Sequence, residues 1–299
     1  MILYSSDLSL PLLRRGKVRD VYEADGSLLI VATDRLSAFD VVFDQPIPQK
    51  GKVLTQLSAY WFERTRHIVG NHMLSALPER VGNVELTDDQ LWGRCMLCRK
   101  ATPLPVECIV RGYLEGSAWR DYEQTRTVSG IRLPEGLRRR EKLPVPIFTP
   151  TTKAETGHDL PISFEQVVEL VGHETAEFIR LKSLELYQFV HDELLGKGIL
   201  ISDTKFEFGR VEDTILLIDE VFTPDSSRFW DAESYLSGKD SPSLDKQFVR
   251  DYVESIGWNK QPPAPTLPEH VVQETSKRYL QIFQKITGKS LEETLGERG

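Results

Sequence analysis

Strand-like segments of this chain come as neighbouring pairs, and this order constrains the fold more than any other feature of the sequence. Near the N-terminus, Lys17–Ala24 and Ser27–Thr33 are rich in Val, Tyr, Leu and Ile and are separated by Asp-Gly. Asp-Gly between two such segments is a strong signal for a two-residue β-hairpin turn. Leu200–Gly209 and Ile215–Phe222 form a second pair around a polar tip near Asp213. Paired antiparallel strands favour an α+β fold over a doubly wound sheet, in which strands and helices would alternate.

Helical segments complete this pattern. Val53–Thr65 carries apolar residues three and four positions apart, and so does Ser163–Leu195, which Gly172 is expected to divide. Further helices are expected at Leu244–Ile256 and His270–Ile286. The combination predicts an α+β architecture of two lobes, in which antiparallel sheets pack against helices.

Three other segments complete the structural predictions. Gly93–Lys100 and Val106–Tyr113 are expected to pair with each other around Thr-Pro-Leu-Pro. Residues 126–148 are basic and rich in Pro and Gly, so we expect a long surface excursion there.

Composition excludes several classes of protein. With 40% hydrophobic and 27% charged residues, the chain has enough apolar residues for a packed core. The longest apolar runs are strand-sized, far below the roughly 18–20 residues that cross a bilayer, and the N-terminus lacks a secretory signal. A formal net charge of −8 argues against a non-specific nucleic-acid binder. We therefore expect a cytoplasmic protein whose partners are neither membranes nor nucleic acids.

The three cysteines, Cys95, Cys98 and Cys108, are predicted to be core thiols. Cys95 and Cys98 match C-x-x-C, but the sequence has no second such pair to complete a tetrahedral zinc site. On a strand, positions i and i+3 point to opposite faces of the sheet, so these two thiols are not expected to share one ion.

Familiar nucleotide and hydrolase motifs are absent: the sequence contains no P-loop, G-x-G-x-x-G, H-E-x-x-H or G-x-S-x-G. Instead, polar residues gather in short clusters at expected strand ends and loops. Arg15–Asp20 offers a glycine that permits close backbone approach and cations that could cover phosphates, although a solvated basic turn also explains it. Thr33–Asp40 is either part of a site or a network of turn and helix caps.

Three further clusters are suited to binding anions. Arg111–Trp119 carries an arginine, two glycines and a serine at a strand-to-helix junction, where the helix dipole favours negative charge, although a glycine-assisted turn is the alternative. Arg228 follows Asp225 in a loop and could clamp a carboxylate or phosphate with two hydrogen bonds. Lys246 and Arg250 are i,i+4 neighbours that would repel unless an anion lay between them, or unless they form a solvated face.

The most informative cluster lies on the second predicted hairpin. With its tip near Asp213, Glu207 and Asp219 are predicted to lie directly opposite each other on one face. Like charges at such positions destabilise a sheet unless something neutralises them. Mg²⁺ with nucleotide phosphates would do so, and Lys205 on the same face could reach a phosphate. A salt-bridge ladder between Lys205 and these carboxylates is the alternative.

Taken in order, these clusters closely resemble the SAICAR synthetase (phosphoribosylaminoimidazole-succinocarboxamide synthase) family of purine biosynthesis. The resemblance runs through eight collinear segments: GKVRDVYE, ATDRLSAFD, PIPQKGKVLT, VECIVRGYLEGSAW, FTPTTKAETGHD, SDTKFEFG, IDEVFTPDSSRFWD and DKQFVRDY. The stand-alone form of the enzyme is expected, since no second domain of the fused animal type is recognised.

The resemblance implies an ATP-grasp-like fold and an ATP-dependent ligase with Mg²⁺ as cofactor. The enzyme would join the carboxylate of carboxyaminoimidazole ribotide (CAIR) to L-aspartate through an acyl phosphate, giving SAICAR, ADP and phosphate. Residues 1–105 would form a nucleotide-covering lobe, and residues 106–299 a lobe with the metal and substrate site. A monomer or homodimer is expected.

The resemblance also implies roles for individual residues. The ATP-binding residues would be Gly16, Lys17, Arg19, Glu107, Lys205, Glu207 and Asp219. Glu207 and Asp219 would be the metal ligands, and the catalytic residues would be Lys205, Asp219 and Arg228. The substrate-binding residues would be Ser37, Asp40, Arg111, Ser117, His158, Asp159, Asp225, Arg228, Lys246 and Arg250.

Three other functions stay open at this point. A phosphotransferase would use the same nucleotide machinery and release ADP without aspartate. A related amide ligase would act on another carboxylate. A nucleotide-binding module without catalysis would have little use for the set Lys205, Glu207 and Asp219.

Overall fold

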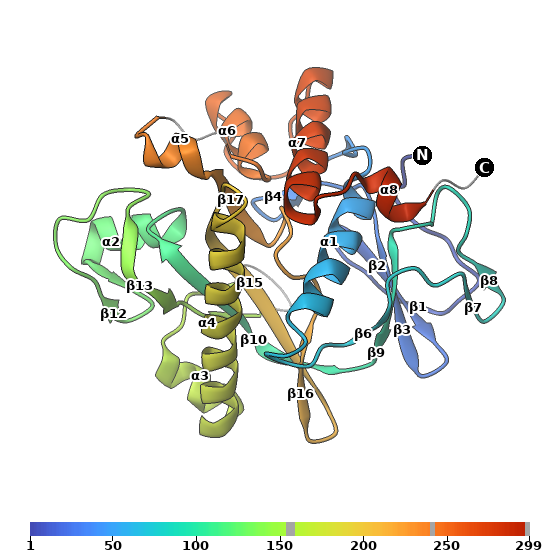
Figure 1. The fold of residues 1–299 in the computed structure, drawn as a ribbon, viewed down its shortest axis with the longest axis horizontal. Helices are drawn as coiled ribbons and strands as arrows, with labels where there is room; N and C mark the ends of the chain where they lie inside the picture. Colours follow the sequence, from blue (N-terminus) through green and yellow to red (C-terminus); the bar gives the residue numbers. More distant parts are fainter. Residues whose placement is uncertain (154–158, 240–242, 297–299) are drawn as a thin grey trace.

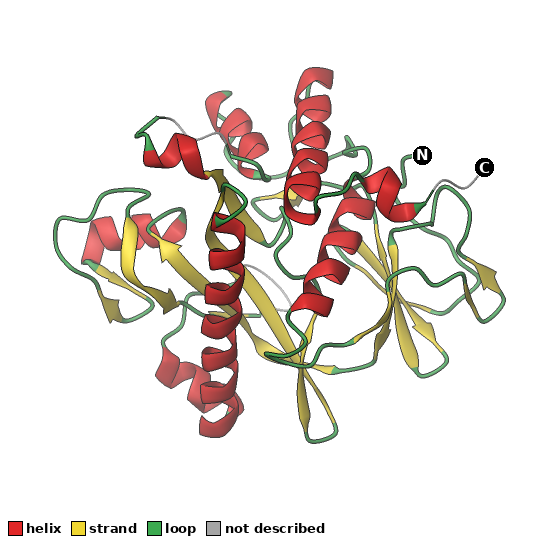
Figure 2. Cartoon of the chain, viewed as in Figure 1, coloured by secondary structure: helices red, strands yellow, loops and turns green. Residues whose placement is uncertain are grey.

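The computed structural model describes residues 1–153, 159–239 and 243–296 (Figure 1). Two antiparallel sheets and the helices packed on them make up most of this chain, as the colouring by secondary structure shows (Figure 2). The predicted α+β class is confirmed. Among the described helices, none is both long enough and apolar enough to cross a membrane.

The first sheet has five strands in the order β1-β2-β3-β9-β6. Their bounds are Leu12–Arg15 (β1), Arg19–Ala24 (β2), Ser27–Ala32 (β3), Met73–Ser75 (β6) and Cys95–Arg99 (β9). The pair Ala24↔Ser27 closes the first predicted hairpin, which is confirmed. Strand β9 pairs with β3 and β6, so its predicted pairing with Val106–Tyr113 is wrong.

The second sheet has six strands, with β13-β10-β15-β16 in one row, β14 paired to β10 and β17 paired to β15. Their bounds are Thr102–Tyr113 (β10), Lys142–Phe148 (β13), Thr151–Thr152 (β14), Ile199–Val211 (β15), Thr214–Ile218 (β16) and Ser227–Asp231 (β17). The predicted surface excursion at residues 126–148 is therefore only partly right. Its last seven residues form β13, because Leu143, Ile147 and Phe148 are buried.

The register of the second hairpin differs by one residue from the prediction. Val211 pairs with Thr214, which leaves a two-residue loop, and Glu207 consequently lies opposite Ile218. Strand β16 ends there, and Asp219 follows with a left-handed φ of 70°. Glu207 and Asp219 are therefore not cross-strand partners as predicted, because the strand ends one residue before Asp219.

The helices agree with the predictions to within a few residues. The predicted helices are α1 (Lys50–Arg64), α3 (Phe164–Val171), α4 (His173–Leu195), α6 (Gln247–Ser255) and α7 (Glu269–Thr287). Ser163 and Gln166 form the expected capping box, and Gly172, with φ of 82°, separates α3 from α4. The remaining short elements are α2 (Ser117–Thr125), α5 (Ala232–Leu236), α8 (Leu291–Leu295), β4 (Ser37–Ala38), β5 (Val41–Val42), β7 (Arg80–Val81), β8 (Val84–Glu85), β11 (Thr127–Val128) and β12 (Ile131–Arg132).

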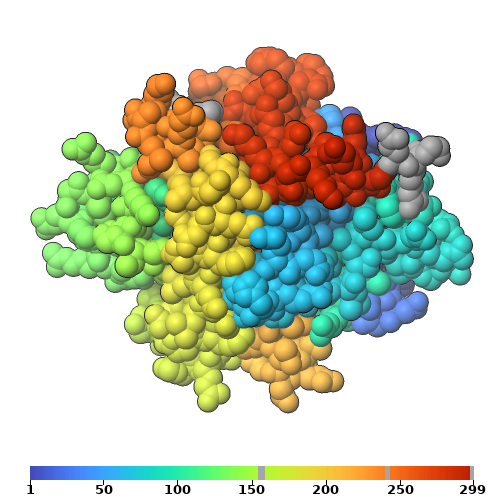
Figure 3. Space-filling model, viewed as in Figure 1, coloured from blue at the N-terminus to red at the C-terminus, as the bar shows by residue number. Residues whose placement is uncertain are grey.

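One continuous apolar core connects the two sheets through α1. Trp61 of α1 packs against Phe222, which packs edge-on against Phe206 of β15 with ring centroids 5.1 Å apart. On the outside, α1 and α4 lie side by side on one face (Figure 3), where Arg64 pairs with Glu193 at 2.5 Å. Helix α1 thus links the part of the chain before residue 105 to the part after it.

The cysteines are buried free thiols, as predicted. Cys95 packs with Tyr22 and Val31 in a small cluster, whereas Cys98 belongs to the main core on the other face of the sheet. Burial raises the pKa of Cys95 to about 12. Since the thiolate is the reactive and metal-binding form, a zinc or redox role for this C-x-x-C is disfavoured.

Candidate active site

Three charged side chains meet where β10 and β15 run side by side. Glu107 and Glu207 are direct cross-strand partners, and Lys205 lies diagonally between them. Its Nζ is 2.7 Å from Glu107 Oε1 and 2.8 Å from Glu207 Oε1. Lys153 also pairs with Glu207. The like charge opposite Glu207 is therefore Glu107 and not the predicted Asp219. Of the predicted alternative ladder, the pair between Lys205 and Glu207 is present, whereas Asp219 pairs with an arginine.

These contacts keep Glu207 ionised. Burial alone would raise the pKa of its carboxyl, but Lys205 and Lys153 outweigh burial and hold it well below the usual range. For Glu107, burial raises the pKa and Lys205 only partly offsets it. The pKa of Lys205 is raised by both carboxylates in spite of burial. At neutral pH the cluster therefore contains a permanent anion and a permanent cation.

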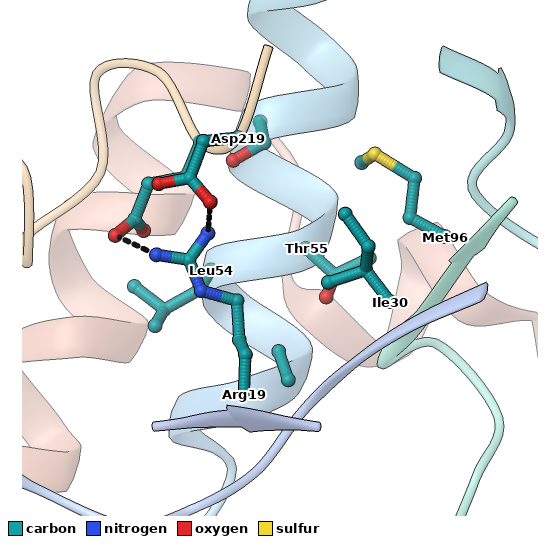
Figure 4. A pocket seen from close by; sticks show the side chains of 9 residues that line it. Arg19, Ile30, Leu54, Thr55, Met96 and Asp219 are labelled. Atoms are coloured by element: carbon teal, nitrogen blue, oxygen red, sulfur yellow. Dashed lines mark hydrogen bonds and ion pairs between the residues drawn. The ribbon is translucent and has the colours of Figure 1, made fainter. Parts of the chain in front are cut away.

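Asp219 meets a cation from the other sheet. The Arg19 guanidinium on β2 donates to Asp219 Oδ1 at 2.5 Å and to Glu220 Oε1 at 2.9 Å (Figure 4). Burial would lower the pKa of Arg19, but Asp219 and Glu220 raise it well above its ordinary value. A small pocket lies beside this pair between the first sheet and α1, lined by Ile30, Leu54, Thr55 and Met96 among others.

The donor set suits magnesium together with phosphate, not a metal site built from protein alone. Among the described residues, no group of three or more His, Cys, Asp or Glu side chains lies close enough together to hold a metal. Glu207 and Asp219 each present carboxylate oxygens that are already paired with cations. Mg²⁺ usually takes only one or two carboxylates and completes its shell with phosphate and water, so this ion needs no larger cluster of protein ligands.

The loop between β1 and β2 lies close to the segment that begins at Thr33. Lys17 pairs with Asp40, which has a left-handed φ of 64°. The Gly16 amide donates to the Arg19 carbonyl at 2.7 Å, which closes the turn. Ser37 is buried in β4. The structure thus brings together a predicted ATP residue, Lys17, and a predicted substrate residue, Asp40.

The second charged group surrounds Asp203, four residues before Glu207 on β15. Arg111 Nη1 donates to Asp203 Oδ2 at 2.7 Å, and Arg228 pairs with the same oxygen. Arg111 also donates to Ser117 Oγ at 3.1 Å. Arg111, Ser117 and Arg228, predicted to hold one anion, therefore do converge.

Glycines let this group pack closely. A Cβ on Gly116, whose φ is 64°, would lie 2.6 Å from Arg228 Nη2, so a larger residue would displace the guanidinium. A Cβ on Gly112 would lie 2.1 Å from the Tyr187 hydroxyl. Arg228 Nε is buried and has no hydrogen-bond partner within the described part of the chain. An unpaired buried donor is costly, so a bound acceptor at this Nε would stabilise the arrangement.

The third group is centred on the carboxylate of Asp225. Lys50 Nζ lies 2.7 Å from Oδ2, and the Tyr279 hydroxyl donates to Oδ1 at 2.6 Å. Lys246 Nζ lies farther away, at 3.9 Å. Burial, together with Arg250 and Lys50, lowers the pKa of Lys246 to about 8, against the opposing effect of Asp225. Asp225 thus serves as a buried anchor for cations, which was not predicted.

Other predicted residues have varied positions. Burial and the nearby Arg228 guanidinium lower the pKa of Arg250, whose Nη1 donates to Gln247 Oε1 at 3.3 Å. Asp159 is exposed and lies close enough to Glu107 to contribute to raising its pKa. His158 falls outside the described residues.

Sequence reasoning missed several charged or hydrogen-bonding members of these groups. They are Lys50, Lys153, Asp203, Glu220 and Tyr279. For Asp203 a signal was available, because Asp203, Lys205 and Glu207 are two residues apart and must share one face of a strand. For Lys50 and Tyr279 no such signal was available, because their partner Asp225 lies 175 and 54 residues away in the sequence.

Comparison with known proteins gives a consistent result over most of the chain. The family described as SAICAR synthetase matches residues 12–265. The phosphoribosylaminoimidazole-succinocarboxamide synthase of Thermodesulfovibrio yellowstonii is 52% identical over 288 residues, which cover 96% of this chain and 99% of that protein. The synthase of Geotalea uraniireducens is 50% identical over 291 residues, which cover 97% and 98%.

A solved structure agrees. The SAICAR synthase of Saccharomyces cerevisiae, complexed with SAICAR, is 41% identical, covers 96% of this chain and 99% of its own, and superimposes with a TM-score of 0.86. The predicted family and fold are confirmed: this chain belongs to the SAICAR synthetase family.

Proposed function

We propose that this protein is the ATP-dependent ligase that joins the carboxylate of CAIR to the amine of L-aspartate, giving SAICAR, ADP and phosphate. The observation that carries the proposal is the placement of two charged groups on one strand. Glu207, with its lysines, and Asp203, with its arginines, lie four residues apart on β15, about 13 Å along the strand. One end suits nucleotide phosphates with metal, and the other suits the phosphate of a ribotide.

The order of the chemical steps follows from the low reactivity of the CAIR carboxylate. A carboxylate reacts poorly with amines, so its oxygen would first attack the γ-phosphorus of ATP, with ADP leaving. The aspartate amine would then attack the acyl carbon and expel phosphate, losing its proton. Phosphoryl transfer depends mainly on positioning and charge neutralisation, and a site of paired cations and carboxylates supplies both. No protein nucleophile is required.

Residue roles are part of the proposal. Glu207 and Asp219 would hold Mg²⁺, which when bound neutralises charge on the transferred phosphoryl group. The remaining ATP contacts would come from Gly16, Lys17, Arg19, Glu107 and Lys205. The ribotide phosphate would lie at Arg111, Ser117 and Arg228, while the rest of CAIR and aspartate would contact Ser37, Asp40, His158, Asp159, Asp225, Lys246 and Arg250. Contact between Lys205 and both glutamates supports its place at the nucleotide.

The proposal also covers the division into lobes, the location in the cell and the oligomeric state. The division at residue 105 into a nucleotide-covering lobe and a substrate lobe fits the first sheet, whose strands all precede it. We also propose a cytoplasmic location, where ATP and the ribotide are made, and a monomer or homodimer.

The decisive experiment measures ADP release and SAICAR formation in the same samples, with ATP, Mg²⁺ and CAIR, with and without L-aspartate. We expect ADP release that requires aspartate and equals the SAICAR formed. ADP release that is indifferent to aspartate, with no SAICAR, would identify a phosphotransferase. Turnover with another carboxylate in place of CAIR, and none with CAIR, would identify a related ligase.

Lys246 gives a prediction on pH. It is faced by Asp225 and Glu220 and by the cations Lys50 and Arg250, and its pKa is lowered to about 8, chiefly by burial. As pH rises through 8, its ammonium loses its charge, so an anionic substrate loses an attractive partner. We expect kcat/KM for CAIR to fall about tenfold above this pH.

The check is the pH profile of Lys246→Arg, whose guanidinium stays charged throughout. The alkaline fall should move to higher pH in this variant. Lys182→Arg, on the surface of α4, is the matched control and should keep the wild-type profile. An identical alkaline fall in Lys246→Arg would assign it to another group.

A further inference from the structure

Arg35 forms an unusually complete set of hydrogen bonds around the loop between β1 and β2. The residue is only 4% exposed. Its Nε donates to the Lys17 carbonyl at 3.0 Å, and its Nη2 donates to the Gly16 carbonyl at 3.0 Å. Nη1 donates to the Tyr4 carbonyl at 2.6 Å, and Nη2 also pairs with Asp20 Oδ1 at 2.8 Å.

Thr33 makes similar hydrogen bonds to the next residue of the loop, Val18. Its hydroxyl donates to the Val18 carbonyl at 2.7 Å, and its amide donates to the same oxygen at 3.0 Å. Three consecutive carbonyls, those of residues 16–18, are therefore turned toward Thr33 and Arg35. In a trans peptide, the N–H of the next residue points opposite to the carbonyl. The amides of Lys17, Val18 and Arg19 consequently point away from Arg35.

Consecutive amides that point the same way form an anion-binding concavity. We infer that Arg35 is the positioning residue of the phosphate-binding loop: by holding the Gly16 and Lys17 carbonyls, it directs the amides of residues 17–19 toward nucleotide phosphates. The inference rests on the proposed function, which places ATP at this loop. It assigns a role to a side chain that itself reaches no substrate.

Only the shape of the guanidinium explains these contacts. Its fork of donors in one plane reaches two carbonyls of the loop, a third carbonyl and a carboxylate at once. A lysine at this position keeps the positive charge beside Asp20 but cannot bond all four acceptors together. The substitution Arg35→Lys therefore separates positioning of the loop from neutralisation of Asp20.

Arg94 provides a matched control. It is completely buried, pairs with Asp34 at 3.0 Å and donates to the carbonyls of Ala32 and Met1. Arg94→Lys therefore removes a comparable guanidinium from the same lobe without removing a bond to residues 16–18. Both variants should lose thermal stability to a similar extent.

The experiment measures dissociation constants of ADP, adenosine and CAIR for wild type, Arg35→Lys and Arg94→Lys by titration calorimetry, with melting temperatures alongside. We expect Arg35→Lys to weaken ADP binding at least tenfold and to leave adenosine and CAIR within twofold of wild type. Arg94→Lys should bind all three as wild type does. Selective loss for the ligand with phosphates is a result that a general loss of stability would not produce.

Two results would overturn the inference: ADP binding by Arg35→Lys within twofold of wild type, or an equal loss for adenosine and ADP. Wild-type protein that fails to bind ADP would overturn the proposed function itself. Should Arg35→Lys not fold, the double variant Arg35→Gln, Asp20→Asn removes both buried charges together and is judged by the same ligands.

Discussion

Asp219→Asn should abolish turnover, with kcat at least about 1000-fold below wild type, while the protein keeps its fold. A loss of this size corresponds to about 4 kcal/mol of transition-state stabilisation, as expected when one of the two carboxylates proposed to hold the metal is neutralised. The fold should survive because Asp219 has a left-handed φ of 70°, which asparagine adopts readily. The measurement is steady-state ADP release, with circular dichroism to establish folding.

The matched control is Glu220→Gln, since Glu220 is the next residue and pairs with the same Arg19. It should lose far less activity than Asp219→Asn. Binding of Mn²⁺ in the presence of ADP, followed by electron paramagnetic resonance, should weaken only in Asp219→Asn. Normal Mg²⁺-dependent activity in that variant would remove Asp219 from the proposed metal site.

Arg228→Lys should raise the KM for CAIR by about 100-fold and change the KM for ATP little. The guanidinium pairs with Asp203 through Nη1, and its buried Nε is available for an acceptor. Lysine replaces this planar fork with a single ammonium, so one of the two interactions is lost and a desolvated acceptor stays unpaired. The loss of about 3 kcal/mol is that of a hydrogen bond to a charged group.

Arg210→Lys is the control for this substitution. Arg210 lies at the far end of β15 and donates to Thr175 at 3.0 Å, away from the three charged groups of the site. Its KM values should match those of wild type. An unchanged KM for CAIR in Arg228→Lys would move Arg228 out of the substrate site.

Local signals in the sequence predicted local structure well. The Asp-Gly turn at residues 25 and 26, the capping box at Ser163 and the break at Gly172 each depend on a few neighbouring residues. Strand pairing depends on distant ones, so β9 was assigned to the wrong partner. The register at Glu207 was off by one because loop length fixes register, and a polar tip does not reveal whether its loop has two residues or three.

In the site, too, features that depend on neighbouring residues were predictable and features that depend on distant ones were not. Residue types that suit phosphates and metal were visible, and the predicted anion-binding group of Arg111, Ser117 and Arg228 does converge. Their counter-ion Asp203 could have been found from its position on the strand, but other counter-ions were not visible, because pairs such as Arg19 with Asp219 join residues 200 positions apart. Periodicity reports which face a side chain occupies, but not which distant strand or helix approaches that face.

The buried contacts of Asp225 bear on how this chain becomes a folded protein. Lys50, at the start of α1, is completely buried and depends on a carboxylate 175 residues later, which in turn bonds Tyr279 in α7. A buried charge without its partner is strongly destabilising. The N-terminal sheet and its helix therefore cannot reach their final packing during synthesis until almost the whole chain has left the ribosome. The two sheets should consequently melt in a single cooperative transition.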